Sequence, residues 1–432
     1  MRFAAYIAAI LLATPAVPVA ANDFETLKGH GGPIMGLAVS PSGAVASASF
    51  DNSVGYWAGD APEWLEAHDA AVVDVVFAND STIISGGDDF TVWLWRDGTG
   101  ELLGRHLGKV TDLEVSPSGD VVASASWDGT VGLWSLNGEA DWSYDQHDAG
   151  FSDVAFSPDG KRLYAATSDG DIMVYETAQE QAPRVLVRHG FGINEMIMSQ
   201  DETWLAYGAV DGVTRVIDPI SGDELSDFSL DRRPILAMTY DAAGEKMAVG
   251  DGHGYIMMID TARWRIVRDF RAMREGPVWA LAFSPDGEFI FTGGIDDVVY
   301  RWPIGFLDEF EPAETTTRSF LREASEMSNG ERQFMRKCSI CHSLDQGASR
   351  KAGPTLYGVF GRKAGTLPGY RYSETLLSSQ VIWSASTIDT LFDEGPDEFI
   401  PDSKMPMQRI TAAQDRDDLI EYLRAETKGL GD

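Results

Sequence analysis

Short runs of apolar and β-branched residues recur along the first three quarters of the chain, separated by tight turns. Four of these turns share one form, in which Ser-Pro is followed by Ser or Asp and then by Gly: residues 40–43, 116–119, 157–160 and 284–287. Proline presets the φ angle at the second position of a turn, and glycine accepts the positive φ that follows. Because β-rich runs flank the turns, the pattern predicts short antiparallel strands.

An aromatic residue recurs about sixteen residues after the proline of these turns, and weaker copies fill the gaps. The full series is Trp57, Trp95, Trp134, Tyr175, Ile217, Ile259 and Trp302. Successive members are 38 to 43 residues apart, which is the period of a four-stranded WD40 blade. The region resembles WD40 repeats, and seven copies favour seven blades over six or eight. We therefore expect an all-β seven-bladed WD40 propeller over residues 22–304.

A second series of polar residues keeps the same period. Six positions before the members of the first series stand Asp51, Asp89, Asp128, Asp169, Asp211, His253 and Asp296. A further 21 or 22 positions earlier stand His30, His68, His106, His147, His189, Asp231 and Arg274. In WD40 repeats, which this region resembles, such a His and Asp hydrogen-bond within a blade and lock its loops. We therefore interpret these histidines as structural residues rather than as metal ligands or acid–base groups.

The segment before the first full repeat reads as one more strand. Residues 23–29 precede the first full blade. A propeller ring must close, since its first and last units would otherwise expose unpaired strand edges. We expect this segment to supply the outer strand of the seventh blade.

A different chemistry begins after a connector at residues 305–321. Cys338, Cys341 and His342 form the motif C-x-x-C-H, which is the attachment site of c-type haem. Two thiols at this spacing can reach the two vinyl groups of one porphyrin, and the following His lies at the iron as an axial ligand. The alternatives are a redox C-x-x-C pair or half a zinc site. Zinc would need two more ligands, and the chain has no other Cys and no other His beyond residue 253.

The iron of such a haem needs a second axial ligand. All seven histidines are assigned above, six to the propeller and one to the motif, so methionine is the usual alternative. Met405 and Met407 are the candidates, because both lie in a short proline-bounded segment that is a poor place for core filler.

The last domain, residues 322–432, resembles a small all-α class I cytochrome c of the mitochondrial cytochrome c and cytochrome c2 group. The similarity rests on residues 351–365, on Tyr370, Tyr372 and Trp383 in step after them, and on residues 399–405. By that resemblance Met405, not Met407, is the second iron ligand. The resemblance implies one covalently attached haem c.

The resemblance also implies roles for residues around the haem. The Pro354 carbonyl should accept a hydrogen bond from His342 and orient its ring. The residues expected to surround the haem propionates are Arg362, Tyr370, Tyr372 and Trp383. Gly330 and Phe334 should mark the crossing of the first helix with the last, and the last helix should span about residues 411–426 with Thr411 as its N-cap.

The first 21 residues have the form of a signal peptide. Arg2 precedes an apolar stretch at residues 3–13, and small residues end the segment at Ala21. The apolar stretch is too short to span a bilayer, and no later stretch is long enough. We expect a periplasmic protein with no transmembrane segment after signal cleavage.

The net charge of −33 is unevenly spread along the chain. Residues 1–321 hold 20 basic and 50 acidic residues, whereas residues 322–432 hold 14 and 17. Phosphate binding needs a basic face, so this balance argues against nucleic acid as a partner. We attribute the acidity of the first region to solubility rather than to attraction of a basic partner.

The favoured hypothesis is an electron carrier rather than an enzyme. One haem passes single electrons, and the propeller docks a protein redox partner, since propeller surfaces are usually docking platforms. The first alternative is a periplasmic oxidoreductase with an active site in the propeller and the cytochrome domain as its electron outlet. The second alternative is a scaffold whose haem senses redox state or a small ligand, which would need an open iron site.

Overall fold

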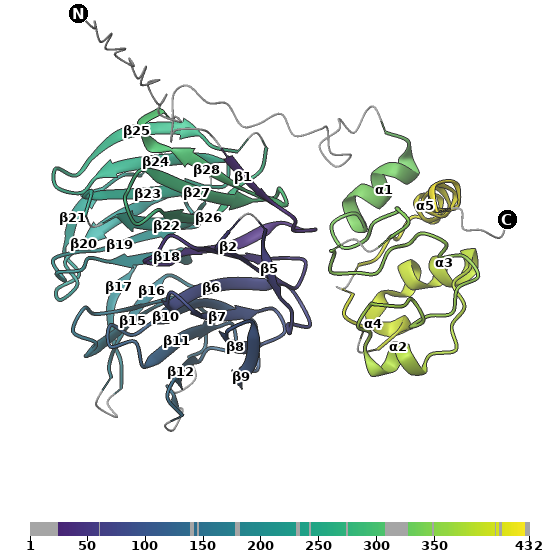
Figure 1. Ribbon diagram of the computed structural model, residues 1–432, viewed down its shortest axis with the longest axis horizontal. Helices are drawn as coiled ribbons and strands as arrows, with labels where there is room; N and C mark the ends of the chain where they lie inside the picture. The colour runs from purple at the N-terminus through teal and green to yellow at the C-terminus, as the bar shows by residue number, and fades with distance from the viewer. Residues whose placement is uncertain are drawn as a thin grey trace, which may run out of the picture.

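A computed structural model defines the two domains and describes residues 25–306 and 327–427. Within these ranges, residues 60, 139–141, 145–146, 178–181, 230–233, 242, 274, 348–349, 402 and 406–407 are not described. Figure 1 shows the strands β1–β28 gathered in one domain and the helices α1–α5 in a smaller one beside it. The predicted signal peptide and most of the connector lie outside the described residues.

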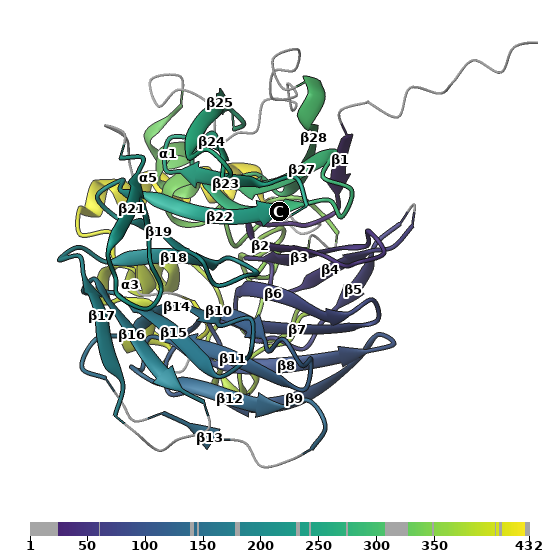
Figure 2. The ribbon, with the colours of Figure 1, turned by 90° about the vertical axis from the view of Figure 1, so that its left-hand side faces the viewer.

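Seven four-stranded antiparallel sheets form the propeller, as the repeat predicts. From inner to outer strand, the first four blades are β2 (Ile34–Val39), β3 (Val45–Ser49), β4 (Val54–Trp57) and β5 (Glu63–Leu65); β6 (Val72–Asn79), β7 (Thr82–Gly87), β8 (Thr91–Arg96) and β9 (Thr99–Arg105); β10 (Val110–Val115), β11 (Val121–Ser126), β12 (Val131–Ser135) and β13 (Trp142–Ser143); and β14 (Phe151–Phe156), β15 (Arg162–Thr167), β16 (Asp171–Glu176) and β17 (Arg184–Arg188). The remaining blades are β18 (Ile193–Met198), β19 (Leu205–Ala209), β20 (Thr214–Ile217) and β21 (Glu224–Asp227); β22 (Ile235–Asp241), β23 (Lys246–Asp251), β24 (Tyr255–Asp260) and β25 (Arg265–Arg271); and β26 (Val278–Phe283), β27 (Phe289–Gly294), β28 (Val298–Pro303) and β1 (Glu25–Lys28). Figure 2 shows these blades fanning around the ring, with the helical domain behind them.

The ring closes through its first strand. β1 pairs with β28 in antiparallel register, and Leu27 lies opposite Val299. The outer strand of the seventh blade therefore comes from the beginning of the described chain, as predicted. This pairing removes the exposed edge that β28 would otherwise present.

The four Ser-Pro turns have the predicted geometry. In each, the glycine N–H donates to the serine carbonyl three residues earlier, at 2.8 to 2.9 Å. The glycine φ angles are 91°, 75°, 68° and 66° at Gly43, Gly119, Gly160 and Gly287. A side chain at these φ values would strain the backbone, so the sequence requires glycine there.

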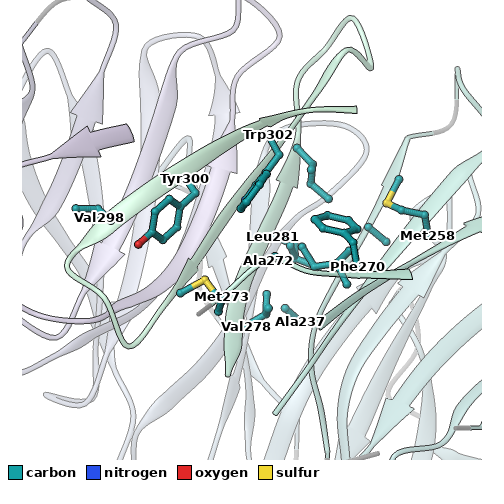
Figure 3. Packing of buried hydrophobic residues seen from close by; sticks show 13 residues of the cluster. Ala237, Met258, Phe270, Ala272, Met273, Val278, Leu281, Val298, Tyr300 and Trp302 are labelled. Atoms are coloured by element: carbon teal, nitrogen blue, oxygen red, sulfur yellow. The ribbon is translucent and has the colours of Figure 1, made fainter. Parts of the chain in front are cut away.

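Apolar side chains from adjacent blades form the core. Between the sixth and seventh blades, Trp302 and Tyr300 of β28 meet Phe270, Met258 and neighbouring apolar side chains (Figure 3). Trp302 is fully buried, and its indole ring lies at 5.9 Å from the Phe270 ring, centre to centre. The aromatic residue that recurs in the repeats therefore packs between adjacent blades, which explains its regular recurrence.

The predicted His–Asp pairs form in four of the five blades that carry them. The pairs are His30–Asp51 at 2.9 Å, His68–Asp89 at 3.0 Å, His106–Asp128 at 3.3 Å and His189–Asp211 at 3.1 Å. In the fourth blade His147 instead accepts a hydrogen bond from the Ala149 N–H at 3.1 Å, because the neighbouring chain turns back on its ring. Asp231 and Arg274 lie outside the described residues.

Five helices form among the described residues of the second domain, and η1 (Ile304–Phe306) follows the last propeller strand. The helices are α1 (Asn329–Lys337), α2 (Glu374–Ser378), α3 (Ala385–Glu394), α4 (Pro396–Phe399) and α5 (Ala413–Glu426). The helices α1 and α5 cross where a Cβ on Gly330 would overlap the Asp418 carbonyl, as predicted. The prediction of Thr411 as N-cap is wrong, because α5 begins two residues later with Ala412 as a cap that has no polar side chain.

Candidate functional site: an apolar pocket behind the C-x-x-C-H turn

The C-x-x-C-H segment forms a turn at the end of α1. Cys338 is the C-cap of the helix, and its own N–H donates to the Phe334 carbonyl. The Cys338 carbonyl then accepts the N–H groups of Cys341, at 3.1 Å, and His342, at 2.8 Å. The helix end and its turn therefore place both thiols and the imidazole on one continuous wall.

Neither thiol is activated for reaction as a thiolate. Burial raises the pKa of Cys338 to about 12 and the pKa of Cys341 to about 11. A reactive or metal-binding cysteine needs a lowered pKa from a nearby positive charge or a helix N-terminus. The turn lies at a helix C-terminus instead, so it does not resemble a thiol–disulfide exchange site.

His342 is held in one orientation. Its Nδ1 lies 2.7 Å from the Pro354 carbonyl oxygen, so Nδ1 carries the hydrogen and Nε2 keeps its lone pair. Burial lowers the pKa of His342, which favours the neutral ring. Gly353 packs against the ring so closely that a Cβ there would overlap Cε1 and Nδ1. The result is an oriented imidazole ready to ligate through Nε2.

One pocket brings every predicted site residue together. Its empty space, including the open mouth, is about 1200 Å³. The predicted residues on its wall are Cys338, Cys341, His342, Pro354, Arg362, Tyr370, Tyr372, Trp383 and Met405. They come from segments more than sixty residues apart in the chain, and the fold alone unites them.

The polar groups of the pocket wall are fixed by backbone carbonyls. Arg362 donates to the Thr355 carbonyl at 2.9 Å and to the Tyr357 carbonyl at 3.0 Å. Tyr370 donates its hydroxyl to the Ala352 carbonyl at 2.5 Å, and its ring packs edge-on against Tyr372. Burial raises the pKa of Tyr370 to about 12, so the phenol stays a neutral donor.

Met405 reaches the pocket from the segment between α4 and α5. Its N–H donates to the Ser403 hydroxyl at 3.2 Å, and its side chain packs against the domain core. Met407 lies outside the described residues. Met405 is therefore the predicted sulfur ligand that the structure places at the pocket.

The sequence-based prediction missed the apolar half of the wall. Ile388, Leu391 and Phe392 of α3 line the pocket, together with Leu356 and Val359. The spacing of the three α3 residues is that of an apolar helix face, a signal present in the sequence. Which ligand the face would meet could not be read from that spacing, because a core-facing helix has the same pattern.

Comparison with known families assigns both domains. The cytochrome c family matches residues 327–426. The chain belongs, through this domain, to the cytochrome c family. The curated relatives include the cytochromes c of Sesamum indicum, 43% identical over 102 residues, and of Arabidopsis thaliana, 40% identical over 101 residues. Each alignment covers 23% of this chain, and 90% and 88% of the respective relative.

The propeller carries the second match. The WD domain, G-beta repeat family matches residues 22–58, 63–96, 100–135, 138–176 and 264–302. Strands β18–β24 of the fifth and sixth blades fall between the fourth and the last of these matches, yet the structure forms both blades with the same four strands. A WD40 propeller is commonly a platform for protein interactions.

The pocket fits the cofactor that the cytochrome c family implies. The family carries haem c and transfers electrons through it. Two thiols at the required spacing, an imidazole whose Nε2 keeps its lone pair and a thioether line a largely apolar pocket. The chemistry of this donor set is that of a haem iron site.

Proposed function

We propose that this protein is a periplasmic c-type cytochrome that carries single electrons through one haem. The observation that carries the proposal is the pocket, which unites the C-x-x-C-H turn, the oriented His342 ring and Met405. The export signal predicted at residues 1–21 supports a periplasmic location, where c-type haem would be attached.

Four side chains would hold the cofactor. Cys338 and Cys341 would attach haem covalently through thioether bonds, and His342 Nε2 and Met405 Sδ would bind its iron. When bound, the haem supplies a one-electron redox centre. A thioether opposite an imidazole raises the reduction potential of such a centre.

The remaining pocket residues tune that centre. The apolar side chains of α3 exclude water, and a low-polarity pocket disfavours the more highly charged oxidised state. Arg362 and Tyr370 hold fixed hydrogen bonds at the wall, where a haem would present its propionates. The chain's own residues therefore set the potential through burial and hydrogen bonding.

The propeller would dock the redox partner on the face that carries the His–Asp pairs. In a four-stranded antiparallel blade, the loop between the second and third strands lies on the same face as the link from the fourth strand to the next blade. Among the described residues, loops of this face expose five large apolar side chains, here named the apolar patch: Phe90, Leu107, Trp127, Phe191 and Val210. Leu107 and Trp127 are 91% and 61% exposed, and exposed patches of this kind mark interaction surfaces.

One member of the apolar patch is held at a strained backbone position. Phe90 has φ 71°, a left-handed conformation that a bulky side chain rarely adopts. Its N–H donates to the Gly87 carbonyl at 3.0 Å, which closes the turn. The equivalent turn positions of other blades hold Asn52 or a glycine, also at positive φ, so the turn itself does not require an aromatic side chain at this exposed position.

An active site within the propeller gains less support. In four propeller histidines both ring nitrogens are engaged, one by the paired Asp and the other by a Ser or Tyr hydroxyl, which fits a structural role. Within the described part of the chain, no three His, Cys, Asp or Glu side chains stand where they could hold a metal ion.

No described helix has the length and apolar content needed to cross a membrane.

Denaturing mass spectrometry of the periplasmic protein tests the cofactor and the location together. We expect a chain that starts at Asn22 and carries the mass of one haem. Replacing both Cys338 and Cys341 with Ser should remove that mass. The Ser339→Ala control, between the two cysteines, should keep it. A mature chain without covalent haem would refute the proposal.

Electron exchange with periplasmic extract tests the docking role. We expect the double variant Leu107→Ala/Trp127→Ala to exchange electrons with the extract several-fold more slowly, while its reduction by ascorbate is unchanged. Ile266→Ala, an exposed residue of β25, serves as the control. Equal rates for all three proteins would exclude the apolar patch as the docking surface.

A further inference from the structure

The loop between β5 and β6 of the propeller contacts the cytochrome domain through a carboxylate that binds two cations. Arg371 Nη2 lies 2.6 Å from Asp69 Oδ1, and Lys404 Nζ lies 2.8 Å from the same oxygen. Arg371 Nη2 also donates to the carbonyls of Ala67 and His68, each at 2.9 Å. The side chain and the backbone of the loop therefore act together on the cytochrome domain.

Glu66 of the same loop makes a second contact with the cytochrome domain. Arg350 forms an ion pair with Glu66, and its guanidinium lies 4.1 Å from the centre of the Trp64 ring. Both charge pairing and stacking on an aromatic ring suit a guanidinium. A Cβ on Gly31 would overlap the Arg350 carbonyl, so the two domains are in close contact here.

The three cations belong to the rim of the haem pocket. Lys404 itself lines the pocket beside Met405. Arg371 follows Tyr370, and Arg350 lies two residues before Ala352; Tyr370 and Ala352 are both on the pocket wall. A cationic rim around a redox pocket attracts an acidic surface, because complementary charge steers docking.

We propose that the loop at residues 66–69 is a built-in acidic partner of this cationic rim, and that an external acidic redox partner competes with it for Arg350, Arg371 and Lys404. The inference rests on the proposed function only for the role of that partner. The contact itself follows from the chain's own residues.

The contact is suited to reversible release. The side chains of Asp69 and Arg371 are 55% and 60% exposed, and exposed ion pairs are individually weak and screened by salt. A partner with several carboxylates can therefore displace a loop that offers two. The remaining propeller face, with the apolar patch, would stay free to hold that partner.

Removal of the two loop charges tests the proposal by hydrogen exchange. In the variant Glu66→Gln/Asp69→Asn of the full chain, we expect amide exchange to rise several-fold in peptides that contain residues 66–69 and residue 371. The control is Glu63→Gln, an exposed carboxylate of β5 for which no contact with the cytochrome domain is seen among the described residues. Unchanged exchange in both peptides of the double variant would overturn the proposal, whether or not haem is bound.

Oxidation by small charged complexes gives a second readout. Each complex accepts one electron from the reduced haem. At low ionic strength, the double variant should react about tenfold faster with the hexacyanoferrate(III) trianion, because the cationic rim is uncovered. It should react no faster with the tris(phenanthroline)cobalt(III) trication. An equal rise with Glu63→Gln would show a general charge effect and would overturn the inference.

A variant without charge change separates docking from electrostatics. Gly31→Ala adds a methyl group where the Arg350 carbonyl lies, so it should raise exchange in the same two peptides. Gly59→Ala, at a position with no atom within 4 Å of a built Cβ, is the matched control. Exchange that is the same in Gly31→Ala and Gly59→Ala would contradict the docked arrangement.

Discussion

A serine at the centre of a hydrogen-bond network holds the loops in each of the first three blades. In the second blade, Ser85 Oγ lies 2.8 Å from both His68 Nε2 and Trp95 Nε1. Burial disfavours the charge of Asp89, yet hydrogen bonds from His68 and Thr91 outweigh it and lower its pKa to about 2. The network therefore links the periodic aromatic to the His–Asp pair in one buried unit.

Ser85→Ala leaves the buried Trp95 N–H without its acceptor and the buried His68 Nε2 without its donor. We expect it to lower the free energy of unfolding by about 1–3 kcal/mol, which is the cost of an orphaned buried polar group. Urea denaturation monitored by tryptophan fluorescence would measure the loss. Ser81→Ala, at an exposed turn of the same blade, should change stability by less than about 0.5 kcal/mol. Equal stability of the two variants would contradict the network.

Gly353 fixes the position of the His342 ring by close steric contact rather than by a hydrogen bond. A methyl group in Gly353→Ala would overlap the ring and displace it from the Pro354 carbonyl. We expect less haem per chain and a lower reduction potential, measured by haem absorbance and by redox titration. Gly59→Ala is the control, because no atom lies within 4 Å of a built Cβ there. Gly361→Ala is less suitable, since the φ of 82° at Gly361 would strain an alanine. Wild-type potential in Gly353→Ala would argue against a positioning role.

Individual residues show what the sequence could and could not predict. The His–Asp pairs were predictable because both members recur at the blade period. The serine that links such a pair to the periodic aromatic was not singled out, since small residues fill many core positions. The nine pocket residues were predictable from a motif and a family resemblance. His147 departs from its pair because local backbone geometry, which the period does not encode, supplies a nearer partner.

At the scale of elements, the strands were easier to predict than the helix ends. The Ser-Pro turns define where strands begin, and the closing role of β1 follows from the need to pair the last edge. The start of α5 was predicted two residues early, because Thr411 is a good N-cap residue by type. Ala412 occupies the cap instead, and the first turn of α5 lacks a side-chain acceptor.

The vacant cap of α5 predicts a stabilising substitution. Ala412 has φ −80° and ψ 119°, an extended conformation that suits a capping side chain, and it is exposed. Ala412→Asp should raise stability by about 0.5–2 kcal/mol, since the carboxylate would accept a free N–H of the first turn. Thermal unfolding followed by helical circular dichroism would measure the gain. Thr411→Ser is the control, and a gain of the same size there would refute the assigned cap.

At the scale of the whole molecule, the blades are tied together by carboxylates along the central channel. Asp74, Asp112 and Asp153 each accept an N–H from the inner strand of the next blade at 3.0 Å. Glu114 accepts the Phe156 N–H in the same way. Asp74, Asp112 and Glu114 are half-buried on the channel wall, so their carboxyls gain hydrogen bonds but lose part of their hydration.

This arrangement predicts that the propeller loses stability as pH rises. Burial, with a smaller contribution from the Asp112 charge, raises the pKa of Glu114 to about 8 despite the hydrogen bond from Phe156. Because the folded pKa exceeds the ordinary value of 4.5, the stabilising contribution is complete below pH 4.5 and is lost as pH rises through 8. Burial also raises the pKa of Asp112, to about 6, so its contribution is lost earlier.

Glu114→Gln keeps an acceptor for Phe156 but cannot ionise. We expect its unfolding free energy to fall less steeply than that of the wild type between pH 5 and pH 8 in a urea series. Glu63→Gln, at an exposed carboxylate, should follow the wild-type slope. If Glu114→Gln and wild type keep parallel slopes, the channel carboxylates do not govern the pH dependence.

The central proposal is that His342 and Met405 of this chain both bind one haem iron. The visible absorption spectrum of the oxidised full-length protein tests it most directly, through the weak far-red band of methionine–iron ligation. The account predicts this band in the wild type and in Met335→Leu, a methionine of the same domain core outside the pocket wall. It predicts loss of the band in Met405→Leu. A spectrum unchanged by Met405→Leu, or a chain without haem absorbance, would contradict the account.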